Sequence, residues 1–334
     1  MLRFLRPALE CARCAALCAA ACALASAAAD GAAQELTIAV SRSSLSLPIY
    51  VAETLDYFKA EGVAVRTREC LGGHRCIKQM LDGEVSLATS SEMPVMVNSL
   101  ERADFAIVAT FATSKRDVKL VARRSAGIAA PGDLAGKRVA TMAGTSAHYF
   151  LDLYLLFNGV DPRSVAVVPL APEQIVAAVQ QGTVDATATF EPFAHRAMLA
   201  LAQDGIVLPG ARIYTETFNL SARRTLIAER EGDLVKLMRA LARAQRFIRE
   251  QPRQAQAILR DRMREDQGYI DATWKDFDYR MSLDQPLIST LEGQARWALR
   301  EGHLPAGSRV PNFLHFVAPE PLRKAEPAAV TLVK

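Results

Sequence analysis

The chain has 334 residues, which at roughly 150 residues per domain favours two domains and excludes a single small binding module. Half of the residues are hydrophobic and 23% are charged, a globular composition that excludes a disordered chain. The 40 basic and 36 acidic residues give a net charge of +4. Non-specific binding of nucleic acid requires a broad electropositive surface, and a net charge this small does not provide one. We therefore expect no nucleic-acid partner.

Residues 1–29 have the pattern of a secretory signal peptide. Arg3 and Arg6 give a positive start, and an apolar stretch from Cys14 to Ala29 ends in small residues. About sixteen alanine-rich residues are too few to span a membrane, which needs roughly 20. We therefore predict cleavage after Ala29 or a few residues later. Lipidation at Cys22 is the alternative, disfavoured because only alanine precedes that cysteine.

The cysteines divide between this segment and the rest of the chain. Four lie before residue 30, so they indicate no metal or redox site in the exported protein, and removal of the segment leaves a net charge of +2. Cys70 and Cys76 remain, on either side of a Gly-Gly turn. In an oxidising compartment such a pair is typical of a disulfide. A zinc site that uses His74 would lack a fourth ligand, so we predict no metal site.

From residue 36 the sequence alternates between strand and helix patterns. In chain order we expect a strand over 36–40, a helix over 48–60, a strand over 63–67, a helical turn over 77–81, a strand over 85–89, a helix over 94–100 and a strand over 106–111. Such alternation is typical of βαβ units and a largely parallel sheet.

The same pattern then begins again. We expect strands over 138–141, 165–168, 184–187 and 206–208, with helices over 146–157, 172–180 and 192–203. Gly62-Val63 corresponds to Gly159-Val160, and the offset between the copies stays near about 98 residues. Two copies of one α/β unit predict two similar lobes.

Strand-like runs over 118–123 and 218–224 are expected to leave the first and second lobes. Amphipathic helices follow residue 229, including stretches around Trp274 and Trp297, and we expect them to pack on the first lobe as part of its core. We therefore place lobe 1 at residues 34–122, lobe 2 at 123–218, and a return to lobe 1 at 219–334.

Serine- and threonine-rich loops follow several of these strands. The carboxyl ends of parallel strands meet at one edge of a sheet, where ligands bind. Gly144-Thr145-Ser146, at a helix start, offers backbone N–H groups, hydroxyls and the positive end of a helix dipole, which favour a small anionic group. The alternative is that such serines serve only as helix N-caps. Four such loops from two lobes favour a ligand site.

Enzyme chemistry has little support in the sequence. Beyond residue 29 we find no paired metal-ligand motif, no phosphate loop and no dinucleotide fingerprint, so we predict no cofactor. Ser146 and His148 are two residues apart on a predicted helix and do not face each other. We predict a binding protein without catalytic residues.

Six segments together resemble the periplasmic substrate-binding proteins of ABC importers, in the group that binds nitrate, sulfonates, taurine or thiamine precursors. They are residues 48–52 (PIYVA), 57–63 (YFKAEGV), 133–139 (DLAGKRV), 144–148 (GTSAH), 182–186 (GTVDA) and 191–193 (EPF). The resemblance implies an α/β type II periplasmic-binding-protein fold with two lobes and two hinge strands. It also implies a monomer in the periplasm that traps a solute between closing lobes and delivers it to a permease in the inner membrane.

Ligand contacts follow from the family's positions and from the edge loops. The resemblance implies Ser41, Ser43, Ser90, Ser91, Thr145, Ser146, Phe190, Glu191 and Asn219; Arg42, Thr113 and His148 lie in or beside the same loops. Arg42 and Glu191 suit a small sulfonate or carboxylate, anionic or zwitterionic, without excluding a neutral pyrimidine. Phe190 stands where the family often has tryptophan. A sensory partner of a receptor, or an enzyme on this fold, stays open as an alternative.

Overall fold

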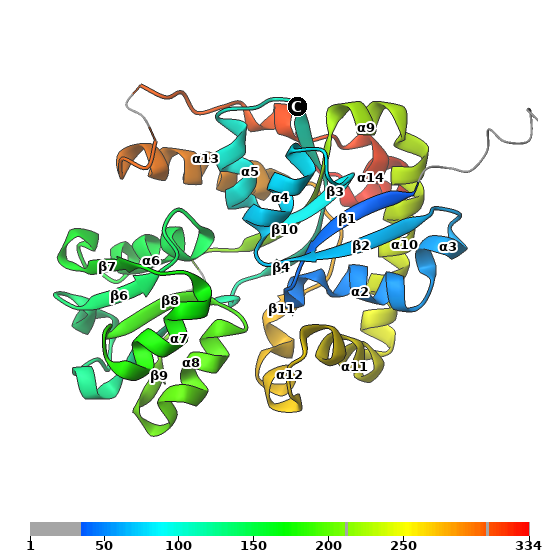
Figure 1. Cartoon of the computed structure of the whole chain (residues 1–334). Coiled ribbons are helices and arrows are strands. Elements are labelled where there is room, and N and C mark those ends of the chain that lie inside the picture. The colour runs from blue at the N-terminus through cyan, green and yellow to red at the C-terminus, as the bar shows by residue number, and fades with distance from the viewer. Residues whose placement is uncertain (1–34, 211–212, 305–306, 334) are drawn as a thin grey trace, which may run out of the picture. The chain divides into compact units, whose positions relative to one another are not determined.

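Two sheets organise the computed structural model, which describes residues 35–210, 213–304 and 307–333. The first sheet contains β1 (Leu36–Ser41), β2 (Val65–Cys70), β3 (Leu87–Ser91), β4 (Phe105–Ser114), β10 (Glu216–Arg223) and β11 (Phe277–Asp278), in the order β11-β4-β10-β3-β1-β2. The second contains β5 (Val118–Arg123), β6 (Arg138–Thr141), β7 (Ala166–Pro169), β8 (Ala186–Phe190) and β9 (Gly205–Val207), in the order β7-β6-β8-β5-β9 (Figure 1). We call each sheet with its helices a lobe. The predicted signal peptide lies outside the described residues.

Helices accompany both sheets. The first copy of the α/β unit has α2 (Leu47–Thr54), α3 (Tyr57–Ala60), α4 (Gly73–Leu81) and α5 (Glu92–Ser99), and the second has α6 (Ser146–Phe157), α7 (Pro172–Gln181) and α8 (Phe193–Leu201). The C-terminal part adds α9 (Arg224–Glu229), α10 (Glu231–Glu250), α11 (Pro252–Met263), α12 (Gln267–Thr273), α13 (Gln285–Arg300) and α14 (Glu320–Ala325). In the described part of the chain, no helix combines the length and apolarity needed to cross a membrane.

The predicted strands and helices form, with one break. The helix expected over 48–60 is two helices, because Asp56 adopts a left-handed conformation (φ 55°) between α2 and α3. A residue in that conformation cannot continue a right-handed helix. Strands β1 and β4 are almost entirely buried, as expected for strands that have a neighbour on each side and are covered on both faces.

The two sheets have matching strand orders and exchange one strand each. β5 follows the first copy in sequence but pairs antiparallel with β8 and β9 of the second sheet. β10 follows the second copy but pairs antiparallel with β3 and β4 of the first. The runs expected to leave each lobe are therefore internal strands of the other one. The lobe boundaries move from 122/123 to between β4 and β5, and from 218/219 to between β9 and β10.

Buried Glu92, the first residue of α5, joins three elements. Its carboxylate accepts hydrogen bonds from the Thr217 backbone N–H (2.9 Å) and hydroxyl (3.0 Å) on β10, and from Gln294 Nε2 (2.7 Å) on α13. The Tyr214 hydroxyl donates to the same carboxylate. Burial raises the pKa of Glu92, against the effect of these hydrogen bonds. The carboxylate thus fixes α5 and α13 against the strand that returns from lobe 2.

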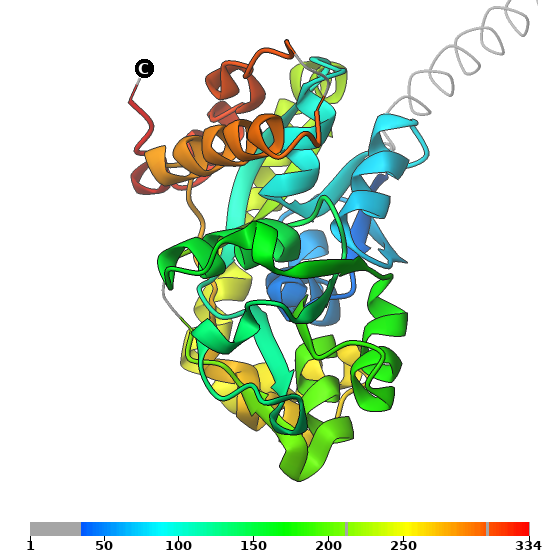
Figure 2. The ribbon, with the colours of Figure 1, turned by 90° about the vertical axis from the view of Figure 1, so that its left-hand side faces the viewer.

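Helix α13 contacts both lobes. It packs on α5 of lobe 1, and Figures 1 and 2 show its ribbon above α6 of lobe 2. Its Trp297 lies against α6, where the indole Nε1 donates to Asp152 at 2.7 Å. The Trp297 ring also makes edge contacts with His148 and Tyr149 of α6. The expectation that this tryptophan packs within lobe 1 is therefore wrong. Its indole is one of the contacts by which the C-terminal helices reach lobe 2.

Trp297→Phe should lower the free energy of unfolding by about 1–3 kcal/mol, because it leaves the buried Asp152 carboxylate without its donor. Denaturant unfolding followed by circular dichroism measures this loss. The matched control is Trp274→Phe, in a half-buried turn, for which we expect a smaller loss. Equal losses in the two variants would contradict the role of the Asp152 hydrogen bond.

Candidate functional site

A cleft lies where the carboxyl ends of strands from both sheets meet, and its walls come from both lobes. Lobe 1 contributes the loop after β1, the loop between β2 and α4, and the face of α5; lobe 2 contributes the loops after β6 and β8 and the start of α7. The cleft encloses about 200 Å³. This is below the roughly 300–1,000 Å³ of sites for drug-sized ligands, so it suits a small solute.

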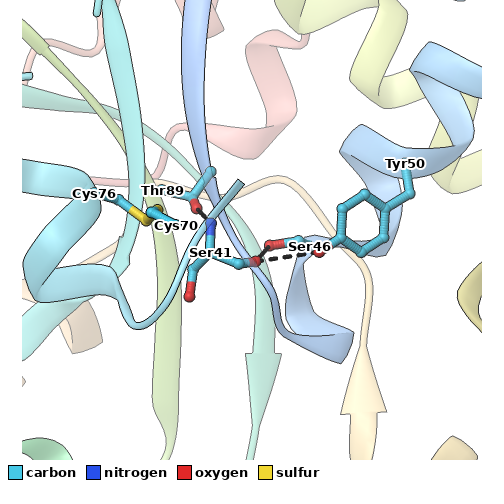
Figure 3. Close-up of a disulfide and its surroundings, with 6 residues drawn as sticks. All are labelled: Ser41, Ser46, Tyr50, Cys70, Cys76 and Thr89. Carbon is cyan, nitrogen blue, oxygen red and sulfur yellow. Dashed lines mark hydrogen bonds between the residues drawn. A yellow bond between two sulfur atoms is a disulfide. The ribbon is translucent and has the colours of Figure 1, made fainter. Parts of the chain in front are cut away.

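Local hydrogen bonds fix the loop after β1. The Ser41 carbonyl accepts from the Ser46 hydroxyl (2.7 Å) and the Tyr50 hydroxyl (3.2 Å), and the Ser41 N–H donates to Thr89 Oγ1 at 2.8 Å (Figure 3). Burial raises the pKa of Tyr50 to about 12, so its hydroxyl keeps its proton at neutral pH. The loop is held from β3 and α2, and Arg42 extends from it into the cleft wall.

The predicted disulfide is confirmed, and it closes a loop that lines the cleft. Cys70 and Cys76 are bonded with their Cα atoms 5.6 Å apart, and the Cys70 carbonyl accepts from the Arg42 N–H at 3.1 Å. The loop between them carries His74 and Arg75 to the cleft. A Cβ at Gly73 would lie 2.7 Å from the Ser90 Cα, so only glycine allows this approach to β3.

The start of α6 presents backbone rather than hydroxyl donors. Thr145 Oγ1 donates to the Met142 carbonyl at 2.6 Å, and Ser146 Oγ donates to Glu216 Oε1 at 3.0 Å. Both hydroxyl protons are therefore used inside the protein. Gly144, Thr145 and Ser146 line the cleft at the start of this twelve-residue helix, whose positive dipole end favours an anionic group, and the Gly144 N–H donates to His148 Nδ1 at 3.3 Å.

Glu191 lines the cleft but has both carboxylate oxygens occupied. Lys119 Nζ lies 2.6 Å from Glu191 Oε1 and 2.8 Å from Asp276 Oδ2, and the His195 N–H donates to Glu191 Oε2 at 3.0 Å. Burial by itself would lower the pKa of the Lys119 ammonium group. The neighbouring Glu191 and Asp276 carboxylates have the larger effect, and the pKa is raised. Glu191 thus anchors Lys119 at the wall of the cleft.

Two further carboxyl groups, Asp117 and Glu216, are buried at the cleft and face each other. Burial, and after it the neighbouring Glu191 charge, raise the pKa of Asp117 to about 7, although a hydrogen bond with Glu216 opposes the rise. Burial and the Asp117 charge also raise the pKa of Glu216 well above its usual range. The pair therefore favours holding a proton at neutral pH.

Eight of the twelve predicted ligand residues line the cleft, and four do not. The eight are Ser41, Arg42, Ser43, Ser91, Thr145, Ser146, Phe190 and Glu191. Ser90 packs behind the wall, and Thr113 lies along β4. Asn219 is buried between strands, where it accepts from Thr110 Oγ1 at 2.6 Å. The His148 ring faces Trp297 and His303, away from the cleft lining, because its helix turns that side toward α13.

Asp117, Glu216 and Arg75 line the cleft but were missed from the sequence. Each belongs to a segment whose place depends on long-range pairing or on the disulfide. The signal that could have found the two acids is strand exchange. Once 118–123 and 216–223 are recognised as exchanged strands, Asp117, directly before the first, and Glu216, which begins the second, fall at the crossings between lobes. The described residues hold no cluster of three or more metal-ligating side chains.

A family model described as NMT1/THI5 like matches residues 44–255. The match covers more than half of the chain, and the protein belongs to the NMT1/THI5-like family. The predicted two-lobed fold of periplasmic binding proteins is confirmed by solved structures. The periplasmic aliphatic sulphonate binding protein SsuA from Escherichia coli superposes with a TM-score of 0.75 at 18% identity, over 85% of this chain and 92% of that one. The nitrate-binding protein NrtA from Synechocystis PCC 6803 gives 0.69 at 14% identity, over 88% of each chain.

Two relatives are similar in sequence. The taurine-binding periplasmic protein of Escherichia coli (strain K12) is 28% identical over 209 residues, which are 61% of this chain and 63% of that protein. The putative aliphatic sulfonates-binding protein of the same organism is 29% identical over 193 residues, 56% of this chain and 58% of that protein. The chain thus matches less than two thirds of the length of each. Both relatives are binding proteins by name.

The double variant Cys70→Ser/Cys76→Ser should be less stable by about 2 kcal/mol, the low end for disulfides because the closed loop is short. Thermal unfolding measures the loss. A reducing agent should lower the melting temperature of the wild type and leave the double variant unchanged. A wild type that is insensitive to reduction would contradict the prediction.

Asp117→Asn should gain stability relative to the wild type as the pH rises. The folded wild type keeps a proton on Asp117 up to about pH 7, whereas the unfolded chain loses it near its ordinary pKa of 3.8. Stability from this group is therefore present at low pH and lost as the pH rises through about 7. Between about pH 5 and 7 the free energy of unfolding of the variant should rise by roughly 2 kcal/mol relative to the wild type.

Denaturant unfolding at several pH values checks this difference, with Glu173→Gln as the control because Glu173 is an exposed carboxylate of the same cleft. The groups that face Asp117 are Glu191, Glu216, Lys119, Asp276, Tyr269 and Tyr279. If the difference in free energy of unfolding between Asp117→Asn and the wild type stays constant with pH, Asp117 does not hold a proton in the folded protein and the prediction is wrong.

Proposed function

We propose that this protein is the periplasmic solute-binding component of an ABC importer. In this proposal it binds a small solute with a sulfonate or carboxylate group between its lobes and passes it to a permease in the inner membrane. The observation that carries the proposal is the cleft, which is lined by both lobes, while strands β5 and β10 each join the sheet of the other lobe and so mark two crossings between β4 and β5 and between β9 and β10. Rotation about two short crossings is the usual way such lobes close on a ligand.

Arg42 supports an anionic solute. Its side chain lines the cleft, and within residues 35–210, 213–304 and 307–333 it forms no ion pair. Arg75 and the positive end of α6 add to the same preference. The names of the two relatives, a taurine-binding protein and a putative aliphatic sulfonates-binding protein, indicate ligands of this kind. Phe190 and Phe193, in edge contact at 5.8 Å, supply an apolar wall for the rest of the solute.

The protein acts as a monomer in this account, because one chain supplies both walls of the cleft. It changes no bond of the solute. After prolonged incubation, mass spectrometry should recover the solute unaltered.

A thermal-shift screen of taurine, aliphatic sulfonates, nitrate, aromatic carboxylates and pyrimidines tests the function. A true ligand binds only the folded state, so at about 100 times its Kd it should add about 2.7 kcal/mol of stability. Arg42→Gln should weaken binding of the hit by about tenfold or more, as expected for a lost hydrogen bond to a charged group. Arg68→Gln, an exposed arginine on β2, is the control. A screen without any hit would contradict the proposed function.

A further inference from the structure

Each crossing between the lobes ends in a buried carboxyl group that lines the cleft. Asp117 directly precedes β5, and Glu216 is the first residue of β10; they are 4% and 5% exposed. The antiparallel register of β10 on β4 places Glu216 opposite Ser114, three residues before Asp117. The strand exchange therefore brings the two acids together where both lobes meet.

Apart from the proton that the two acids share, one oxygen of each has no hydrogen-bond donor in the described chain. Glu216 Oε1 accepts from Ser146, but Glu216 Oε2 and Asp117 Oδ1 accept from no described donor outside the pair. A buried polar atom without a partner is costly, and native proteins avoid it outside functional sites. Because both residues line the cleft, a bound solute can supply the missing donors.

The nearest cation is not available to these two acids. Lys119 directs its ammonium group to Glu191 at 2.6 Å and to Asp276 at 2.8 Å. Arg116 also pairs with Asp276, at 3.2 Å. Within the described ranges, neither Asp117 nor Glu216 forms an ion pair with a basic side chain. A cationic group of a solute would therefore be the counter-ion of the pair.

The basic and acidic side chains that line the cleft come from different places. Arg42 and Arg75 belong to lobe 1, Asp117 and Glu216 stand at the crossings, and Glu173 and Glu191 belong to lobe 2, where Glu191 is paired with Lys119. We propose that Asp117 and Glu216 form the subsite for a primary ammonium group, so that the solute is an amino-substituted sulfonate or carboxylate. This inference rests on the proposed function. An ammonium group has three N–H donors, enough for Asp117 Oδ1 and Glu216 Oε2 together.

Binding of the ammonium group displaces a proton. The hydrogen bond between the two carboxyl groups requires that one of them is protonated. When the N–H donors of the solute take the place of that hydrogen bond, the shared proton leaves to the solvent and both carboxylates carry charge beside the cation. The ionisable groups around the pair are Glu92, Glu191, Asp276, Lys119, Tyr269 and Tyr279. A solute without the ammonium group displaces no proton.

Isothermal titration calorimetry with matched solutes tests the inference. Taurine is compared with ethanesulfonate, and β-alanine with propionate, so that each pair differs by the amino group. The wild type should bind the amino member of at least one pair about tenfold or more tighter. Asp117→Asn and Glu216→Gln should each reduce that preference by about tenfold or more and leave the affinity for the amine-free member nearly unchanged. Glu101→Gln, which removes an exposed charge outside the cleft, should keep the preference.

Titrations near pH 7 in buffers of different ionisation enthalpy count the protons released. The amino solute should release a proton and its amine-free partner none. Binding of both members of a pair with equal affinity, or binding of the amino solute without proton release, would overturn the ammonium subsite and leave the proposed function intact. Failure of all four solutes to bind would overturn the subsite; the broader screen then decides separately whether the proposed function stands. The number of protons released on binding is measured on the wild type alone. The inference can therefore be tested even if Asp117→Asn or Glu216→Gln fails to fold.

Discussion

The exchange of one strand between the two sheets is the constraint on which the rest of the structure depends. β5 completes lobe 2 and β10 completes lobe 1, so neither sheet closes its core without a strand from the other half of the sequence. The chain must then cross between lobes at two places that are close in space. The cleft forms at those crossings.

This arrangement also explains why charge is concentrated at the cleft. Asp117, directly before β5, and Glu216, the first residue of β10, lie at the crossings, so their side chains are buried between the lobes and shielded from solvent. Asp117 and Glu216 consequently hold a proton that exposed carboxyl groups would lose. On the lobe 1 side of the cleft, the hydrogen bonds of Glu92 fix α5 to β10, and the disulfide closes the loop that carries Arg75. A rigid basic wall and a protonated acidic pair suit a solute with two opposite ends.

Local patterns in the sequence predicted most of the elements and the edge at which the cleft lies, because strand and helix periodicity depends on near neighbours. Ser41, Arg42 and Phe190 were found because they directly follow predicted strands. Pairing across more than a hundred residues leaves no periodic signal, so the exchanged strands, and with them Asp117 and Glu216, were misplaced or missed. His148 was misjudged for the same reason, since the helix that covers it is α13, far away in the sequence.

A crystal structure of the protein with an amino-substituted sulfonate such as taurine tests the central claim most directly, that the solute is held between the exchanged strands by both lobes. The account predicts that the sulfonate lies against Arg42 on lobe 1 and that the nitrogen lies within hydrogen-bond distance of Asp117 and Glu216. A solute bound outside this cleft, or one that contacts a single lobe only, would contradict it.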